Sequence, residues 1–138
     1  MKRKLNAQWI VGFTDSEGCF QIGISSNTKM SIGFQVLPEF VIAQHKRSIE
    51  VLYDLKSFFG CGIVRKNRGQ SNNVYCYRVR NQQHLMLHII PFFEKHSLLT
   101  KKKIDFINFR RVLLLMEKKE HLTPEGLKKI RKLREKKF

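Results

Sequence analysis

The sequence lacks the features of a membrane, secreted or zinc-ribbon protein. No apolar run is long enough to span a bilayer, and the basic first residues are not followed by an apolar signal core or a small-residue cleavage site. The three cysteines include no Cys-x-x-Cys pair, and the five histidines form no His/Cys cluster. We therefore expect no membrane partner and no targeting segment. We also expect reduced thiols in the compartment where the protein is made.

Acidic residues are also scarce. Eleven Asp and Glu stand against 27 Lys and Arg, which gives a net charge of +16. Such an excess favours a polyanionic partner, although charge alone does not separate DNA, RNA and anionic lipid. With 138 residues, 42% of them hydrophobic, the chain has enough apolar material for a core, and we expect one domain over residues 1–138.

The hydrophobic periodicity changes several times along the chain, and each change marks a new element. The predicted order is a helix at 6–15, a hairpin at 19–44, a helix at 49–59, a hairpin at 62–80, and helices at 82–95, 101–119 and from 124 onward. This order is typical of an α+β fold in which a four-stranded antiparallel sheet carries helices on one face. Ile63, Tyr75, Tyr77 and Val79 are expected to point toward those helices.

The other face of the predicted sheet is polar and basic. A two-stranded ribbon fits the DNA major groove, where Gln, Asn and Arg make bidentate contacts with base edges. A solvated sheet face is the alternative, but it usually carries more Glu, Lys and Thr. The outward set predicted to read bases is Gln21, Ser25, Asn27, Gln35, Glu39, Arg65, Asn67, Arg78 and Arg80, with Cys76 in register beside Arg78.

Two carboxylates, Asp15 and Glu17, close the most hydrophobic segment of this basic chain. Acids at a helix C-terminus oppose the helix dipole and repel phosphate. They suit a phosphate-binding protein if they hold Mg²⁺, which takes one or two carboxylates together with substrate oxygens and water. A solvated helix end is the alternative. Gly18 follows, and we expect it to take the left-handed conformation that ends many helices.

The segment "IVGFTDSEG" at residues 10–18 resembles the signature motif of LAGLIDADG homing endonucleases. Further segments resemble the same family in the same order: "CFQIGI", "PEFVIAQ", "FFGCGIV", "YRVR", "LLTKKKIDF" and "HLTPEGLKKI". The resemblance covers nearly the whole chain. It implies the αββαββα fold of that family, with extra C-terminal helices.

The resemblance also implies how the chain assembles. Members of the family pack the motif helix against its counterpart, so Trp9, Gly12 and Phe13 are expected at a dimer interface. The chain has one motif, and a homodimer that reads a long pseudo-palindromic DNA target is implied. The last acid of the motif, Glu17, is expected to bind Mg²⁺ or another divalent cation such as Mn²⁺. The Ser16 carbonyl is a further candidate ligand and Asp15 a lesser one.

Other catalytic and DNA-binding positions follow from the same resemblance. Gln44 matches a residue that orders solvent around the attacking water. The spacing in "LLTKKKID" points to Lys102 as the catalytic lysine, with Lys101 and Lys103 as alternatives. Lys29 and Arg68 join the residues expected to contact DNA.

The predicted function is therefore a Mg²⁺-dependent homing endonuclease that makes a double-strand break in duplex DNA. The alternative is an intron maturase, or another RNA- or DNA-binding protein of the same fold, that does not cleave. Its own intron RNA would then be a partner. The resemblance further implies a gene in an organelle intron, in a chloroplast or a mitochondrion.

Overall fold

The first helix of the protein carries the motif. The computed structural model describes residues 4–67 and 73–135. Helix α1 (Ala7–Glu17) begins at Asn6, whose side chain accepts a hydrogen bond of 2.8 Å from the backbone N–H of Trp9. Such a cap satisfies one of the amide groups that a helix start leaves unpaired. The helix continues through both acids, so Glu17 is its last residue.

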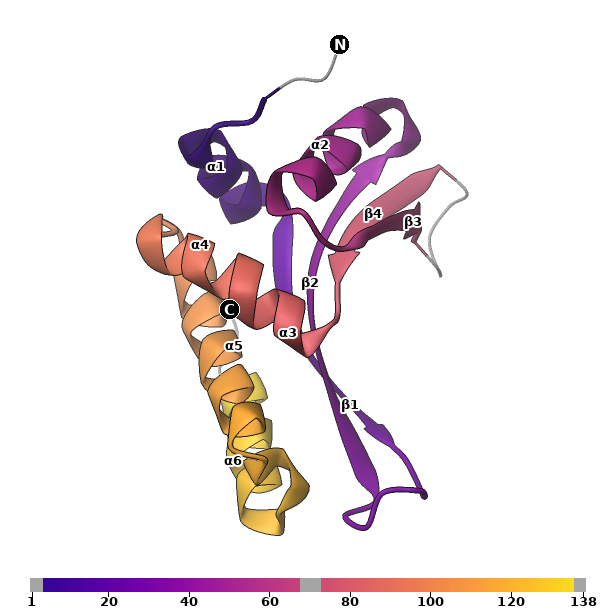
Figure 1. Cartoon of the computed structure of the whole chain (residues 1–138), viewed down its shortest axis with the longest axis vertical. Helices are drawn as coiled ribbons and strands as arrows, with labels where there is room; N and C mark the ends of the chain where they lie inside the picture. Colours follow the sequence, from indigo (N-terminus) through magenta and orange to yellow (C-terminus); the bar gives the residue numbers. More distant parts are fainter. Residues whose placement is uncertain (1–3, 68–72, 136–138) are drawn as a thin grey trace.

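Within the described residues, four strands form one antiparallel sheet in the order β1-β2-β4-β3. The strands are β1 (Gly18–Ser26), β2 (Phe34–His45), β3 (Ile63–Lys66) and β4 (Val74–Val79). The β1–β2 hairpin is the longest pair, and its tip projects away from α2 and β3 (Figure 1). Pro38 lies beyond the end of β4, where β2 has only β1 beside it, so its missing N–H disrupts no central ladder.

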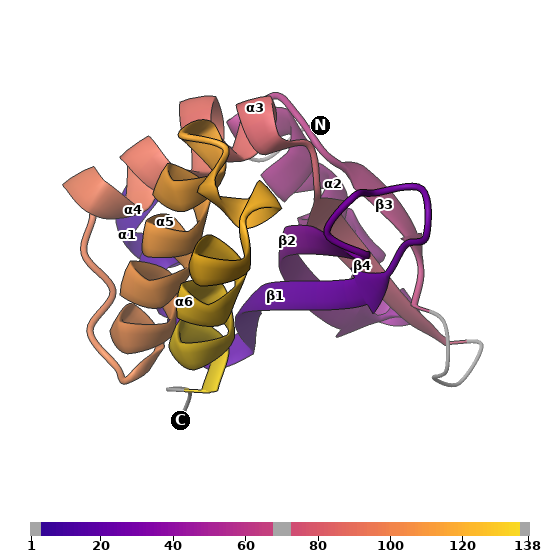
Figure 2. The ribbon, with the colours of Figure 1, turned by 90° about the horizontal axis from the view of Figure 1, so that it is seen from below.

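The helices cover one face of this sheet (Figures 1 and 2). After α2 (Ile49–Phe59) and the second hairpin come α3 (Gln82–His84), a π-helical turn at Leu85–Ile89, and α4 (Ile90–Lys95). The chain ends with α5 (Lys102–Glu117) and α6 (Pro124–Glu135), which lie side by side. The predicted αββαββα order, the four-stranded sheet and the extra C-terminal helices are confirmed.

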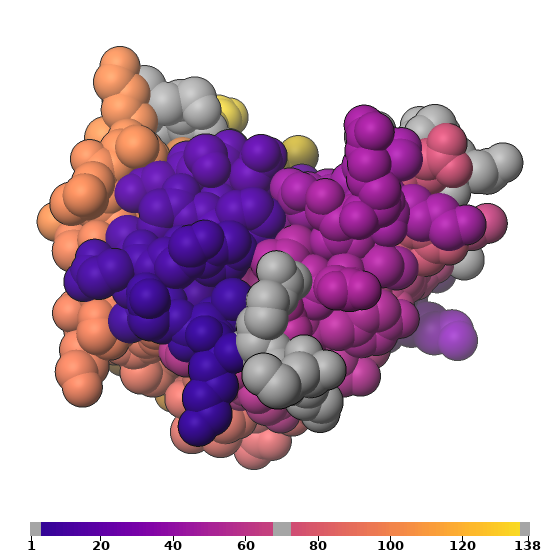
Figure 3. Space-filling model, turned by 90° about the horizontal axis from the view of Figure 1, so that it is seen from above, coloured from indigo at the N-terminus to yellow at the C-terminus, as the bar shows by residue number. Residues whose placement is uncertain are grey.

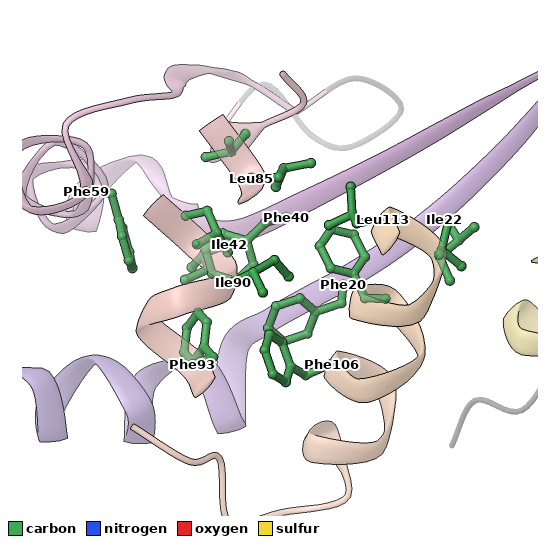
Figure 4. Close-up of a cluster of buried hydrophobic side chains, with 14 of the residues drawn as sticks. Phe20, Ile22, Phe40, Ile42, Phe59, Leu85, Ile90, Phe93, Phe106 and Leu113 are labelled. Carbon is green, nitrogen blue, oxygen red and sulfur yellow. The ribbon is translucent and has the colours of Figure 1, made fainter. Parts of the chain in front are cut away.

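Aromatic rings from the sheet and the helices build the core (Figure 4). The ring of Phe20 on β1 lies 5.1 to 5.6 Å, centroid to centroid, from the rings of Phe40, Phe93, Phe106 and Phe109. Because strand side chains alternate between faces, this inward set leaves the other face of β1 and β2 for polar residues. The core thus fixes which side chains of the sheet point outward.

Gly18 and Ile63 differ from what the sequence predicts. Gly18 has an extended backbone with φ −82°, not a left-handed one. Glycine is needed there because a Cβ atom would lie 2.7 Å from Cγ2 of Thr14 and 2.9 Å from its carbonyl oxygen. Ile63 pairs with Arg78 and is 45% exposed, so it faces outward rather than into the core.

No helix in the described part of the chain combines the length and the apolar character that crossing a membrane requires.

Candidate active site and nucleic-acid interface

The outward face of the sheet gathers most of the side chains predicted to read bases. Residues that oppose each other in an antiparallel pair share one face. Gln21 opposes Glu39, Ser25 opposes Gln35, and Ile63 opposes Arg78. Arg65 opposes Cys76 on the same face. The sequence therefore predicts the orientation of these strand residues correctly, apart from Ile63.

The predicted DNA contacts at the loops have partners of their own. At the tip of the first hairpin, the Asn27 side chain donates to Oε1 of Gln35 at 3.3 Å and accepts from the backbone N–H of Lys29 at 3.0 Å. Asn67, just after β3, continues the pairing through its N–H, which donates to the Val74 carbonyl. Arg68 lies outside the described residues.

Arginines crowd one region of this face. Arg80 donates to a carboxylate oxygen of Glu39 at 2.6 Å. Burial, followed by repulsion from Arg80 and Arg65, lowers the pKa of Arg78. Burial raises the pKa of the Cys76 thiol, which faces outward but is covered. An anion such as a phosphate or an electron-rich base edge would relieve the repulsion among these arginines.

The second predicted site lies where α1 ends. Glu17 is exposed there, and it has no hydrogen-bond or ion-pair partner among residues 4–67 and 73–135. The carbonyl groups of the last helical turn have no partner within the helix and carry partial negative charge. The Glu17 carboxylate and these carbonyl groups, including that of Ser16, therefore give this end of the helix a negative potential.

Asp15 connects this helix end to the loop before α5. One carboxylate oxygen accepts from the backbone N–H of Leu99 at 3.0 Å. The other accepts from the N–H of Thr100 at 3.2 Å and from its hydroxyl at 2.8 Å. Both Asp15 oxygens thus bind the protein's own groups, unlike those of Glu17. No local signal in the sequence reveals the link between Thr100 and a residue 85 positions earlier.

Lys102 is the lysine of "KKK" that the structure brings to the end of α1. Its Nζ donates a hydrogen bond to the carbonyl of Gly18, the residue that follows Glu17. Its backbone N–H donates to the Thr100 hydroxyl at 3.1 Å, which in turn donates to Asp15. Lys102 is half-buried, whereas Lys101 and Lys103 are exposed. We call these residues together with Glu17 the junction, which comprises Asp15, Glu17, Gly18, Thr100 and Lys102.

Gln44 lies on β2, two residues beyond Ile42, which opposes Gly18 at the end of α1. With Arg47 and Ser48 it lines a hollow of about 410 Å³ beside Trp9 and Phe13 of α1. Its side-chain amide donates to the carbonyl of Ala43 at 2.8 Å. Neither Glu17 nor Lys102 lines this hollow.

One face of α1 remains uncovered. Ile10, Val11 and Thr14 are buried against the protein, whereas Trp9 is 42% exposed. The rings of Trp9 and Phe13 stack with centroids 4.7 Å apart. Between them, a Cβ atom added at Gly12 would meet no described atom within 4 Å. Figure 3 views the end of the molecule where α1 reaches the surface beside α2. Trp9 and Gly12 are thus exposed on α1, and Phe13 is half-buried beside them.

The junction suits a hard divalent cation in its donor chemistry. The described residues contain no cluster of three or more His, Cys, Asp or Glu, which excludes a zinc-type cage there. Mg²⁺ is instead commonly held by one or two carboxylates with substrate oxygens and water. The unpaired Glu17 carboxylate and the adjacent helix-end carbonyls fit that pattern.

Comparison with known proteins gives consistent matches. The sequence model described as LAGLIDADG endonuclease matches residues 10–113. "Probable intron-encoded endonuclease 2" of Neurospora crassa is 34% identical over 127 residues, which are 91% of this chain and 26% of that protein. "DNA endonuclease I-CeuI" of Chlamydomonas moewusii is 29% identical over 122 residues, 86% of this chain and 56% of that protein. The chain spans 26 to 27% of the length of the first curated relatives that it matches.

Solved structures share the fold. The crystal structure of the homing endonuclease I-TnaI has a TM-score of 0.92 and 52% identity, covering 98% of this chain and 89% of that one. I-SmaMI bound to an uncleaved DNA target in the presence of calcium ions has a TM-score of 0.90 and 40% identity, covering 95% of this chain and 44% of that one.

Proposed function

Because the chain belongs to the LAGLIDADG endonuclease family, we propose that it is a site-specific homing endonuclease that makes a metal-dependent double-strand break in DNA. The observation that carries the proposal is the junction. Glu17 is an unpaired acid, Lys102 donates to the carbonyl of the next residue, Gly18, and β1 begins at that residue. A protein that only bound nucleic acid would gain nothing from an exposed acid at this place.

Glu17, with the Ser16 carbonyl, is proposed to hold Mg²⁺ or a similar divalent cation. When bound, such an ion lowers the pKa of a coordinated water and stabilises charge on phosphate oxygens. A calcium-containing complex of I-SmaMI with uncleaved DNA supports the choice of a hard cation. Asp15 was the lesser metal candidate, and we now propose that it positions the junction, because both of its oxygens are occupied by Leu99 and Thr100.

Lys102 is proposed to stabilise negative charge on the scissile phosphate. Its ammonium is already held at the end of α1, and a preorganised cation costs little reorganisation when charge develops. Lys103 starts from an exposed position and would need to be ordered first. Gln44 is proposed to order solvent on the approach to the phosphate, together with the hollow that it lines.

The working form is proposed to be a homodimer on double-stranded DNA. The chain matches 89% of I-TnaI but only 44 to 47% of the longer I-SmaMI chain. Trp9, Gly12 and Phe13 leave a helix face open to a second copy. Two copies related by a twofold axis would place two Glu17 side chains near one axis, one for each DNA strand. Each sheet would then read half of a pseudo-palindromic target.

The gene is proposed to lie in an organelle intron. Two relatives are named for such positions, "Uncharacterized 50.9 kDa protein in ND4 intron 1" of Podospora anserina and "Uncharacterized cox1 intron-2 37.2 kDa protein" of Schizosaccharomyces pombe.

A cleavage selection tests the proposed function. A randomised duplex library is incubated with the protein and Mg²⁺, and the cleaved ends are sequenced. We expect one pseudo-palindromic target to be enriched by the unmodified protein and by Glu117→Gln, but not by Glu17→Gln. Glu117 is the matched control because it is also an exposed acid at the last residue of a helix. Binding without cleavage by the unmodified protein would favour the maturase-like alternative.

A further inference from the structure

Two large apolar side chains stand on the polar outward face of the sheet. Leu37 on β2 is 39% exposed and Ile63 on β3 is 45% exposed. Single exposed hydrophobic residues are common and often have no role. These two differ from a random scatter because they stand among the side chains placed to meet bases.

The apolar side chain of Leu37 is surrounded by side chains that can form hydrogen bonds. It opposes Gly23, so β1 contributes no side chain at this level of the face. A Cβ atom at Gly23 would lie 3.1 Å from the Leu37 carbonyl oxygen and 3.5 Å from its Cβ. The flanking outward residues on the two strands are all polar, namely Gln21, Ser25, Gln35 and Glu39. Glycine opposite Leu37 therefore leaves the leucine side chain uncovered.

Ile63 stands in a comparable setting near the other edge of the sheet. It opposes Arg78 and helps to line a hollow of about 270 Å³ with Arg80, Asn81 and His84. The apolar side chain again lies beside donors that suit phosphates or base edges. Since Ile63 faces outward, it contributes nothing to the core and is available to a ligand.

The major groove of DNA offers one apolar group on its base edges, the C5-methyl of thymine. We propose that Leu37 and Ile63 each read the C5-methyl group of a thymine in the target. The proposal rests on the proposed function, because it requires this face to enter the major groove. It gives a role in sequence specificity to two side chains that cannot form hydrogen bonds with bases.

The sheet register limits how far apart the two thymines lie. Ile63 is level with Arg78 and Val41, four residues along β2 from Leu37. That is about 13 Å along the strand and about 10 Å across two strand spacings, or about 16 Å in a straight line. At about 3.4 Å of rise per base pair, the two thymines should be separated by at most about five base-pair steps within each half-site.

Replacing thymine with deoxyuridine tests the proposal, because it removes only the methyl group. The duplex selected by the unmodified protein is synthesised with one deoxyuridine at a time, and binding is measured with Ca²⁺ in place of Mg²⁺. We expect about fourfold weaker binding at two positions per half-site, as the loss of one buried methyl group predicts. All other thymines should tolerate the replacement.

Three variants assign the two positions. Leu37→Ala should abolish the deoxyuridine effect at one position, and Ile63→Ala should abolish it at the other. Leu87→Ala is the control, because Leu87 is 66% exposed but lies in the helical layer, and it should leave both effects intact. Deoxyuridine could also weaken binding by changing the stiffness of the DNA, but such an effect would persist in the alanine variants. Loss of the effect in one variant therefore identifies a contact with the methyl group.

Two results would overturn the inference while leaving the proposed function in place. One is a selected duplex that binds equally well with deoxyuridine at every thymine. The other is deoxyuridine sensitivity that persists unchanged in both Leu37→Ala and Ile63→Ala. Failure to select or bind any duplex would instead overturn the proposed function, and this inference with it.

Discussion

The junction and the outward sheet face are both polar, but they are built differently. At the junction, Asp15, Thr100 and Lys102 are joined by hydrogen bonds between α1, the loop before α5, and α5 itself. On the sheet face, the side-chain bonds among the predicted contacts are Arg80 to Glu39 and Asn27 to Gln35. The junction is therefore held in one geometry, whereas the face keeps adaptable side chains.

This difference suits two tasks. Cleavage depends on groups held close to their working geometry, because small displacements cost large factors in rate. Base recognition adjusts long side chains and bridging water to the target. Changes at the junction should therefore alter the rate of cleavage and leave affinity alone, and changes on the face should do the reverse.

The largest expected effect is at Glu17. Glu17→Gln removes the charge that would hold the cation, and we expect single-turnover cleavage to fall by at least about 10³-fold, since a catalytic metal supplies several kcal/mol. Affinity for the selected duplex, measured with Ca²⁺, should remain within about twofold of that of Glu117→Gln, on the view that base and phosphate contacts from the sheet dominate binding. Equal loss of binding and cleavage would remove the contrast between the two regions.

Lys102→Met should lower the cleavage rate by about 10²-fold, as the loss of one preorganised charge-stabilising group does elsewhere. The methionine keeps most of the length of the half-buried stem. Lys103→Met changes the adjacent exposed lysine and should have little effect on the rate. Single-turnover kinetics on the same duplex distinguish them, and a larger effect at Lys103 would move the catalytic role to that residue.

On the sheet face, Arg78→Ala should weaken binding by about 10- to 100-fold, the typical value of a good base contact. The cleavage rate of the saturated complex should stay unchanged. Titrations at several salt concentrations check whether Arg78 contacts a base or a phosphate. If Arg78 contacts a phosphate, its loss should reduce the slope of log affinity against log salt concentration by about one and should weaken binding to all sequences alike. A drop in rate at saturation would contradict the division of tasks.

Asp15→Ala should have a smaller effect on rate, about tenfold, because Asp15 acts through Thr100 and Lys102. It should also destabilise the protein by about 1–3 kcal/mol, the cost of losing hydrogen bonds to a charged group. Asp15→Asn keeps one acceptor oxygen and should recover part of both losses. Thermal unfolding and cleavage kinetics are measured together, and a loss as large as that of Glu17→Gln would indicate a direct metal ligand instead.

The strand pattern and the motif could be predicted from the sequence because they are local. Alternation along β1 and β2 places Gln21 and Gln35 outward correctly, and the helices predicted at 6–15 and from 124 onward are present as α1 and α6. Family resemblance adds the order of elements. These signals extend over a few residues, so they can be recognised without knowledge of tertiary contacts.

The junction could not be predicted in the same way, because its contacts join residues about 85 positions apart. Nothing near Asp15 indicates that its oxygens accept hydrogen bonds from Leu99 and Thr100. Lys101 precedes α5, and Lys102 and Lys103 differ in their rotation about its axis, which packing sets. The prediction that Ile63 points inward is wrong because side chains two residues apart in a strand share a face, so Ile63 lies on the outward face with Arg65.

Mixing two versions of the chain tests the central claim most directly. The unmodified protein is combined with a large excess of Glu17→Gln on the selected duplex with Mg²⁺, and the products are separated as intact, nicked and linear DNA. If each copy of a homodimer cuts one strand with its own Glu17, mixed dimers should give mainly nicked DNA. The account would be contradicted if no nicked product formed and the amount of linear DNA equalled that produced by the same amount of unmodified protein alone.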